Sequence, residues 1–288
     1  MLNGLVVAAF GKRYEVELED QRRISCVTRG KKTDIATGDF VEIKLTDTSE
    51  GVIEKTLERK SLLYRSNAYK SKLLAANVTQ IVIVLATQPS FYEALLNKCL
   101  VAAEAAHINA LIVLNKCDLK NDEAIEKLKT YEALGYQTVQ LSAKADISPL
   151  LPFLKNHQSV LVGQSGMGKS TIINTLLPNE NTRTQEISIA LDSGKHTTTA
   201  TRLYHLDKNT SLIDSPGLQE FGLHHISQEE LEHAFIEFRP YLGHCRFNNC
   251  KHVHEPDCAI LAQVSLKKIT DSRLSQYHSL EKEIHQGL

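Results

Sequence analysis

The strongest chemical signal in the sequence is a glycine-rich loop that ends in lysine and serine. The loop runs from Gly163 to Ser170 as GQSGMGKS, between the apolar run SVLV and the helical pattern TIINTLL. Backbone N–H groups of such a loop surround phosphate oxygens at a helix N-terminus, while the lysine reaches the β- and γ-phosphates and the serine hydroxyl binds Mg²⁺. The sequence therefore predicts a nucleoside triphosphate site. Its expected phosphate-binding residues are Gly163, Gln164, Ser165, Gly166, Met167, Gly168, Lys169, Ser170 and Thr171.

A second motif, NKCD at 115–118, would select the base. It directly follows the apolar run ALIVL. The Asp118 carboxylate can accept hydrogen bonds from N1–H and the exocyclic amino group of guanine, two donors that adenine does not present together. The tripeptide SAK follows the run QTVQL and offers the Ala143 N–H to guanine O6. We therefore predict GTP as the ligand, which argues against an ATPase or a kinase. The expected base-binding residues are Asn115, Lys116, Asp118, Ser142, Ala143 and Lys144.

Two further segments are typical of parts that sense the γ-phosphate. Asp214 opens the sequence DSPG, which ends at Gly217 and follows the run TSLI. We expect this carboxylate to approach Mg²⁺ and the Gly217 N–H to meet the γ-phosphate. The sequence GKHTTT ends at Thr199 and supplies hydroxyls for the same purpose. Thr198 and Thr199 are both candidates for the Mg²⁺-sensing residue.

More than one residue could orient the attacking water. Leu218 follows Gly217, where many GTPases place a water-orienting glutamine. We therefore expect slow intrinsic hydrolysis that a partner accelerates. His196 and Gln219 are the candidate replacements, although His196 serves equally well as a structural residue of the threonine segment.

A cluster of thiols and histidines near the C-terminus predicts a metal site. Cys245, Cys250, His252 and Cys258 supply three thiolates and one imidazole, the donor set of a closed structural zinc site. His244 and His254 compete with His252 for the fourth position. Thiols gathered in this way indicate a metal rather than disulfides in a reducing compartment. The scattered Cys26, Cys99 and Cys117 are expected to be small buried hydrophobic residues.

The elements that position these motifs form two kinds of pattern. Apolar runs at 81–87 and 110–116 flank a helical pattern at 91–107, and further strands are expected at 137–143 and 159–163. Buried strands that alternate with helices predict a parallel α/β sheet. The base motif precedes the phosphate loop, whereas most GTPases begin with the phosphate loop. We therefore predict a circularly permuted GTPase domain whose γ-phosphate sensor leads directly into the cysteine cluster.

The first sixty or so residues predict a different unit. Five short strand patterns separated by turn residues favour a small β-barrel of the OB type, a fold that often binds oligonucleotides. Basic side chains in it are candidate contacts to RNA phosphates. A solvated face is the alternative, because acidic residues stand among them. These basic residues are Lys12, Arg13, Arg22, Arg23, Arg29, Lys31 and Lys32.

Length and composition limit the remaining possibilities. A chain of 288 residues with 42% hydrophobic residues has room for about two to three compact units. We expect an OB-fold at 1–64, the GTPase domain at 65–224 and a helical zinc-binding domain at 225–288. The net charge of -1 excludes a globally basic coat for nucleic acid. No apolar run approaches the roughly 20 residues of a membrane span, and the N-terminus lacks a signal-peptide pattern, so we predict a cytoplasmic protein.

Taken together, these motifs resemble the RsgA family of small ribosomal subunit biogenesis GTPases over essentially the whole chain. The resemblance implies an OB-fold, a permuted GTPase and a zinc domain that helps to bind the 30S subunit and its 16S rRNA. It also implies that GTP hydrolysis to GDP times release from nearly mature particles. Separately, we expect the protein to act as a monomer. Gly166 stands where related permuted GTPases carry an asparagine linked to potassium stimulation, so we do not expect that dependence. An RNA-binding assembly scaffold with little turnover is the alternative function.

Overall fold

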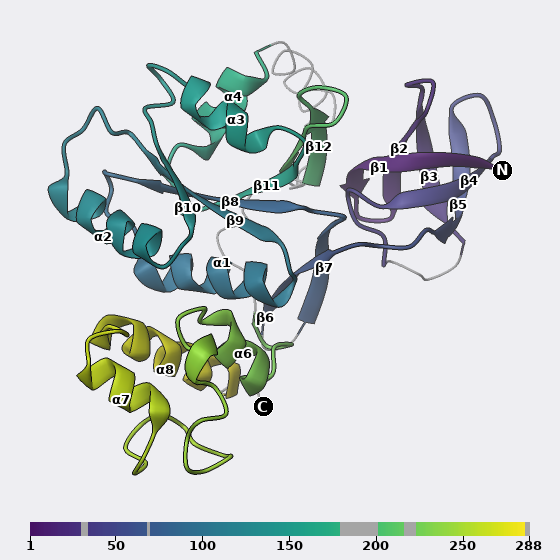
Figure 1. The fold of residues 1–288 in the computed structure, drawn as a ribbon. Coiled ribbons are helices and arrows are strands. Elements are labelled where there is room, and N and C mark those ends of the chain that lie inside the picture. The colour runs from purple at the N-terminus through teal and green to yellow at the C-terminus, as the bar shows by residue number, and fades with distance from the viewer. Residues whose placement is uncertain (30–33, 68–69, 179–200, 216–222, 286–288) are drawn as a thin grey trace.

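The structure is a computed structural model that describes residues 1–29, 34–67, 70–178, 201–215 and 223–285. Figure 1 shows the N-terminal barrel at one end of the central sheet and the C-terminal helices beneath helix α1. This arrangement confirms the predicted fold class, an N-terminal barrel followed by a permuted α/β domain and a helical C-terminal part.

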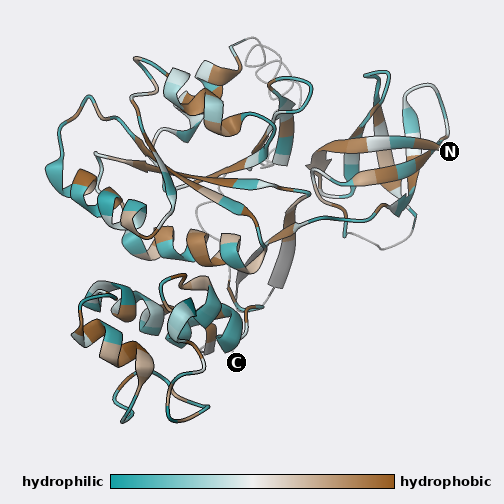
Figure 2. Ribbon diagram, in the orientation of Figure 1, coloured by the Kyte–Doolittle hydropathy of each residue, from teal (hydrophilic) through white to brown (hydrophobic). Residues whose placement is uncertain are grey.

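The barrel forms because its strands alternate buried and exposed residues. Val16, Ile24 and Ile43 are completely or almost completely buried inside it, and Figure 2 shows hydrophobic and hydrophilic residues alternating along these strands. The strand order β1-β2-β3-β5-β4 closes on itself through a pairing of β1 with β4. The five strands are β1 (Leu2–Phe10), β2 (Arg13–Leu18), β3 (Arg23–Thr28), β4 (Phe40–Leu45) and β5 (Glu50–Thr56).

The central sheet is parallel except at one edge, as the continuous apolar runs predict. Every residue of its strand β8 is buried. The strand order is β10-β9-β8-β11-β13, and β12 pairs antiparallel with β13. These strands are β8 (Gln80–Ala86), β9 (Asn109–Asn115), β10 (Gln137–Gln140), β11 (Gln158–Val162), β12 (Thr201–His205) and β13 (Ser211–Asp214).

Helices cover both faces of this sheet. Helix α1 lies on one face, and α3 and α4 lie on the other (Figure 1). Asn121 caps α2 by accepting a hydrogen bond from the Ala124 N–H. The helices of this part are α1 (Glu93–Ala105), α2 (Asp122–Ala133), α3 (Leu151–Leu154) and α4 (Lys169–Leu176).

One strand pairing makes the barrel and the central sheet continuous. β1 pairs antiparallel with β12, with Ala8 opposite Arg202 and Ala9 opposite Thr201. The His205 Nε2 atom also lies 2.8 Å from a carboxylate oxygen of Glu17 in β2. The result is a single sheet of eleven strands among the described residues. The local sequence patterns did not predict this junction.

A two-stranded hairpin connects the barrel to the central sheet. Its strands are β6 (Leu62–Asn67) and β7 (Lys70–Ala76), which pair with each other. The hairpin was not predicted, because the segment lacks the Asn-Gly or Asp-Gly turn that marks a tight hairpin. The predicted division between residues 64 and 65 falls inside β6, so the division into three units remains a prediction.

The C-terminal part is helical at both ends, as predicted. An aromatic core of Phe235, Phe238 and Tyr277 holds its helices together. Helix α6 packs against α1, and a capping box between Ser227 and Glu230 fixes its N-terminus. The helices are α6 (Gln228–Ala234), α7 (Ala259–Ser265) and α8 (Asp271–His285).

A buried arginine attaches the C-terminal part to α1. The Arg273 guanidinium donates to Glu237 at 2.5 Å and also to the Asn97 side chain of α1. The side chains of Arg273 and Glu237 are only 5% and 7% exposed, so neither charge could be left unpaired without a large cost. The contact with Asn97 therefore fixes α8 on α1. Among the described helices, none is both long and apolar enough to cross a membrane.

Candidate nucleotide site and metal cluster

The glycine-rich loop lies between the central strand β11 and the N-terminus of α4. Gly168 precedes α4 with a φ of 99°, a conformation that glycine adopts without steric cost. A Cβ atom at this position would lie 2.2 Å from Nδ2 of Asn115, and one at Gly163 would lie 2.3 Å from the carbonyl oxygen of Val84. The loop can therefore lie against the ends of β8 and β9 only with glycine at these two positions.

The lysine of the loop is half-buried among carbonyl groups. Lys169 Nζ donates to the carbonyl oxygens of Gly163 and, at 2.9 Å, Gln164. Burial lowers the pKa of Lys169, and the charge of Asp214 acts in the opposite direction. Burial likewise raises the pKa of Asp214, opposed by Lys169. The ends of β11 and β13 thus place an ammonium and a carboxylate in one partly desolvated region, which suits a bound triphosphate and its metal ion.

The buried side chain of Asn115 connects three of the predicted motifs. Its Nδ2 donates to the Met167 carbonyl at 3.0 Å, and its Oδ1 accepts from the Ala143 N–H at 2.9 Å. Asn115 is only 2% exposed, so these bonds are well shielded from water. The end of β9 therefore fixes the relative positions of the phosphate loop and the SAK segment. A guanine O6 that approached Ala143 would share this N–H with Asn115.

The Asp118 carboxylate lies exposed at the rim of the same region. Ser142 Oγ donates to Asp118 Oδ1 at 2.5 Å, and this bond lowers the pKa of Asp118. Positive charges on Lys144 and Lys116 act in the same direction. Lys116 Nζ in turn donates to the Gln88 carbonyl at 2.8 Å. The carboxylate is thus held ionised and oriented, as acceptance of two guanine N–H bonds requires.

Thr87 and Asn121 brace this region, although neither was predicted from the sequence. Thr87 Oγ1 donates to the Lys116 carbonyl at 2.7 Å, and Asn121 Nδ2 donates to the Thr87 carbonyl at 2.8 Å. Thr87 follows β8 just as Asn115 ends β9, and neighbouring parallel strands end at the same edge of a sheet. The position of Thr87, directly after a buried strand, was the sequence signal by which this residue could have been predicted.

The remaining predicted nucleotide-site residues divide into two groups. Ser170 and Thr171 lie in the first turn of α4, and Ser165 and Gly166 lie on the exposed side of the loop. The predicted residues His196, Thr198, Thr199 and Gly217 lie outside the described residues, as do Leu218 and Gln219. Their assigned roles remain predictions.

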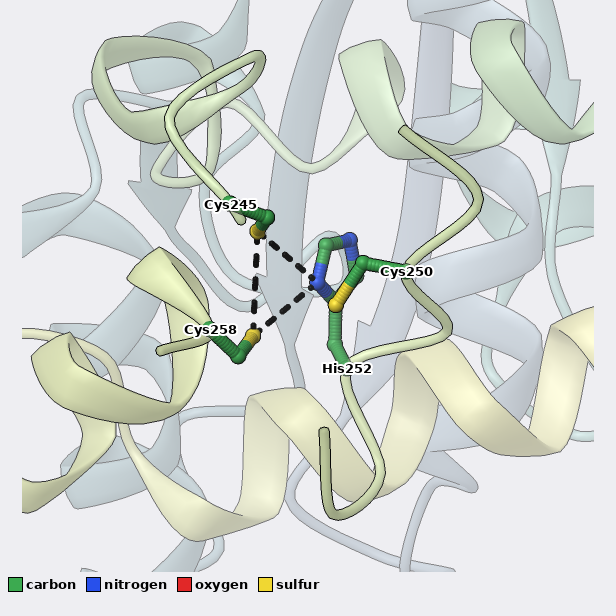
Figure 3. A group of neighbouring side chains, drawn as sticks. All are labelled: Cys245, Cys250, His252 and Cys258. Atoms are coloured by element: carbon green, nitrogen blue, oxygen red, sulfur yellow. Dashed lines mark hydrogen bonds between the residues drawn. The ribbon is translucent and has the colours of Figure 1, made fainter. Parts of the chain in front are cut away.

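The four predicted metal ligands converge in the C-terminal part. One donor atom from each of Cys245, Cys250, His252 and Cys258 lies within 4.8 Å of the others. Figure 3 shows the three thiols and the imidazole of His252 pointing toward one another from two loops and the start of α7. His252 Nδ1 lies 3.3 Å from the Cys258 sulfur and 3.7 Å from the Cys245 sulfur.

The outer nitrogen of His252 faces a carboxylate. Its Nε2 atom is buried without a hydrogen bond among the described residues, and it lies 3.7 Å from Glu232 Oε1, an ion-pair distance rather than a hydrogen-bond distance. A carboxylate behind a histidine is the usual outer partner of a metal-bound imidazole. His244 and His254, the competing candidates, are exposed and lie outside the cluster. Three sulfurs and one nitrogen in this geometry fit a tetrahedral zinc ion.

Comparisons with known proteins agree with this architecture. The family model described as RsgA GTPase matches residues 56–224. A protein of Nitrosospira multiformis named small ribosomal subunit biogenesis GTPase RsgA is 51% identical over 97% of this chain and 90% of its own length. A protein of Nitrosomonas europaea with the same name is 48% identical over 98% of this chain and 91% of its own length.

Two solved structures resemble the whole chain. The crystal structure of YjeQ from Thermotoga maritima superimposes with a TM-score of 0.77 at 31% identity, covering 98% of both chains. The structure of YloQ, described as a circularly permuted GTPase, gives a TM-score of 0.72 at 26% identity, covering 99% of this chain and 96% of its own. The base motif, the phosphate loop and Asp214 follow one another in the order of a permuted GTPase domain. Together with the family model and these relatives, this order shows that the chain belongs to the RsgA GTPase family and is a GTP hydrolase.

Proposed function

We propose that this protein binds the small (30S) ribosomal subunit late in its maturation and that GTP hydrolysis times its release. The observation that carries the proposal is the meeting of NKCD, SAK and the phosphate loop at Asn115, in a chain that spans 90% of a relative named for small-subunit biogenesis. The motifs predict that the nucleotide is GTP. The name of the relative indicates that the particle is the small ribosomal subunit.

In this proposal each nucleotide-site residue has one task. Asp118 selects guanine, and the N–H groups of the glycine-rich loop hold the phosphates. Lys169 neutralises charge that develops on the transferring phosphoryl group. Ser170 and Asp214 would hold Mg²⁺, which supplies further charge stabilisation when bound. Gly217 and one of Thr198 and Thr199 would sense the γ-phosphate, and His196 remains a candidate for orienting water.

The cysteine cluster would hold one structural zinc ion. Its ligands Cys245 and Cys250, His252 and Cys258 come from segments with little regular structure, so the metal would stabilise the fold of the C-terminal part directly. Because Arg273 fixes that part to α1, a particle bound there could act on the GTPase domain. Zinc has no chemical step in this proposal.

The barrel is the proposed contact for 16S rRNA. The salt bridges of the barrel indicate which of its basic residues are the better candidates for binding RNA phosphates. Arg22 pairs with Asp20, Arg23 with Glu15 and Glu17, and Arg29 with Glu54, so three predicted phosphate contacts are partly neutralised. Lys31 and Lys32 lie outside the described residues. Lys12, just before β2, and Arg13, its first residue, are therefore the better candidates among those described. Surface pairs are weak enough to exchange their partners for phosphate, so Arg22, Arg23 and Arg29 are not excluded.

The alternative function is an RNA-binding assembly scaffold in which nucleotide occupancy matters and turnover hardly does. Membership of a GTP hydrolase family favours the timer. We propose that the protein acts as a monomer in the cytoplasm.

The decisive experiment is GTP turnover at fixed enzyme concentration with increasing amounts of purified 30S subunits, and with 50S subunits as the control. The timer model expects strong acceleration by 30S subunits alone, because Leu218 leaves the water-orienting role to a partner. Binding in the GTP state and release in the GDP state should accompany it. Tight 30S binding with unchanged turnover would support the scaffold instead.

A further inference from the structure

A buried hydroxyl group of the barrel contacts the strand that follows the threonine segment. Thr37 lies between β3 and β4 and is 0% exposed. Its Oγ1 donates to the carbonyl oxygen of Thr201 at 3.0 Å. Thr201 begins β12 and stands two residues after Thr199, a candidate γ-phosphate sensor. The barrel therefore holds the backbone at the exit of the threonine segment.

Thr201 also contacts the segment that contains Asp214. Thr201 Oγ1 lies 3.2 Å from Ser215 Oγ, and Ser215 is only 9% exposed. Arg202 is the strand partner of Asp214, so the two segments are also joined by the β12–β13 ladder. A continuous hydrogen-bonded path thus runs from Thr37 through Thr201 to Ser215, beside the Asp214 carboxylate.

The barrel end of this path is rigid. Asp39, two residues after Thr37, is 0% exposed and accepts from the Ala36 N–H at 2.8 Å. The same carboxylate pairs with Arg59 at 2.7 Å. A buried carboxylate with both partners in place cannot shift without losing a large interaction energy. The loop that presents Thr37 is therefore a fixed support.

This loop also contacts the strand that leads to the phosphate loop. A Cβ atom at Gly38, where φ is 94°, would lie 2.2 Å from the carbonyl oxygen of Ala76, the last residue of β7. The backbone of the loop is therefore in close contact with the end of β7. Gln158, the first residue of β11, donates from Nε2 to the same carbonyl at 2.8 Å. One short loop of the barrel is thus connected to β11 as well as to β12.

We infer that Thr37 is a positioning residue for GTP hydrolysis, holding Thr201 and, through it, Ser215, so that the threonine segment ends and the segment after Asp214 begins at one fixed point. The inference rests on the proposed roles of Asp214 and the threonine segment. The barrel would then have a second role besides contacting RNA. A partner that binds the barrel would act on both segments at once through a single hydrogen-bonded path.

The test compares two substitutions that differ in one hydroxyl group. Thr37→Val keeps the shape of the side chain and removes the donor, whereas Thr37→Ser keeps the donor. Thr56→Val, in β5 of the barrel, is the control, because β5 does not pair with β12. For each full-length protein, kcat and KM for GTP, the affinity for fluorescent GDP and the thermal midpoint are measured. GDP lacks the γ-phosphate, so its affinity reports on the integrity of the site without the sensing step.

We expect Thr37→Val to lower kcat about threefold to tenfold, the effect of one lost hydrogen bond, with GDP affinity within about twofold of the parent protein. Thr37→Ser and Thr56→Val should keep the parent kcat. Equal kcat for Thr37→Val and the parent would overturn the inference. A parallel loss of GDP affinity and thermal stability would also overturn it, because the residue would then serve only the fold.

A second variant tests the path itself and does not depend on the folding of Thr37→Val. Ser215→Ala removes the far end of the path, and it should lower kcat by a similar factor with GDP affinity unchanged. The double variant should lose no more than the larger single loss, since both changes break one route. Losses that multiply would reject the common path. Asp214→Asn tests the proposed site separately: near-normal turnover in that variant would reject the role of Asp214, whereas the Thr37 comparison tests the positioning role alone.

Discussion

Asn115 and Gly168 lie so close that no side chain could stand between them. A Cβ atom on residue 168 would lie 2.2 Å from Asn115 Nδ2, the atom that donates to the Met167 carbonyl. The base motif and the phosphate loop therefore share one contact surface, and a single buried amide fixes the relative positions of the two segments that are predicted to hold the base and the phosphates.

The first prediction concerns this contact. Gly168→Ala should push Asn115 out of place and weaken GTP and GDP binding by more than about tenfold, because the displaced amide also positions Ala143. The control is Gly135→Ala. Gly135 has a similar φ of 98°, but a Cβ atom added there would meet no atom of the described residues within 4 Å, so that variant suffers only the backbone cost of about 1 kcal/mol. Isothermal titration with GDP distinguishes the two. Equal affinities would show that the close contact has no role in binding.

The second prediction concerns base selection. Asp118→Asn should weaken GTP binding by at least about tenfold and shift preference toward xanthosine triphosphate, because an amide donates where the carboxylate accepted. Competition between the two nucleotides measures the shift, with Asp122→Asn in the first turn of α2 as a control. An unchanged preference would remove Asp118 from the base site.

A further prediction concerns how the affinity for GTP depends on pH through the carboxylate of Asp118. Ser142 lowers the pKa of Asp118, so the carboxyl group stays ionised well into the acidic range. The contribution of Asp118 to GTP affinity should therefore be fully present above the ordinary aspartate range and be lost only as the pH falls through the lowered pKa. Ser142→Ala should move that loss to higher pH. Affinity profiles of the two proteins that coincide would contradict this role of Ser142.

The third prediction concerns the metal. Purified protein should contain about one zinc ion per chain, and Cys250→Ser should release it and lower the thermal midpoint while GDP binding persists. Cys26→Ala is the matched control, since Cys26 is a buried thiol of the barrel core outside the cluster. Elemental analysis measures zinc in both proteins. Equal metal content in Cys250→Ser and Cys26→Ala would contradict the assignment.

The fourth prediction concerns the attachment of the C-terminal part. Arg273→Met should destabilise the protein by about 3–5 kcal/mol, because it leaves the buried Glu237 carboxylate without its partner. Adding Glu237→Gln should recover part of the loss, since the unpaired charge is then removed. Urea denaturation measures both. A double variant as unstable as the single one would mean that packing, rather than charge, holds this contact.

The motifs and their supporting strands could be predicted because their signals are local. β8 is apolar after Gln80, and β9 carries the apolar run ALIVL between two asparagines, as buried parallel strands require. The phosphate loop is read from adjacent residues. The cysteine cluster was also recognisable, since its four donors fall within a short stretch of sequence.

The features that could not be predicted from the sequence mostly depend on residues far apart in the chain. The contact of Thr37 with Thr201 joins positions 164 residues apart, and the bond from Arg273 to Asn97 spans 176 residues. No local pattern marks such pairs. The hairpin of β6 and β7 was missed for a different reason, because the sequence between these strands lacks the Asn-Gly or Asp-Gly pair that usually marks a tight hairpin.

The pairing of β1 with β12 has a practical consequence for anyone who would dissect this protein. β12 is the outermost strand of the GTPase part, and the barrel supplies its second neighbour. A fragment that began after the barrel would leave Thr201 and Arg202 of β12 without their partners in β1, and exposed strand edges of this kind recruit other chains. Such a fragment should self-associate, so any activity lost on truncation would mix aggregation with the loss of barrel function. Single-residue variants of the intact chain avoid that ambiguity.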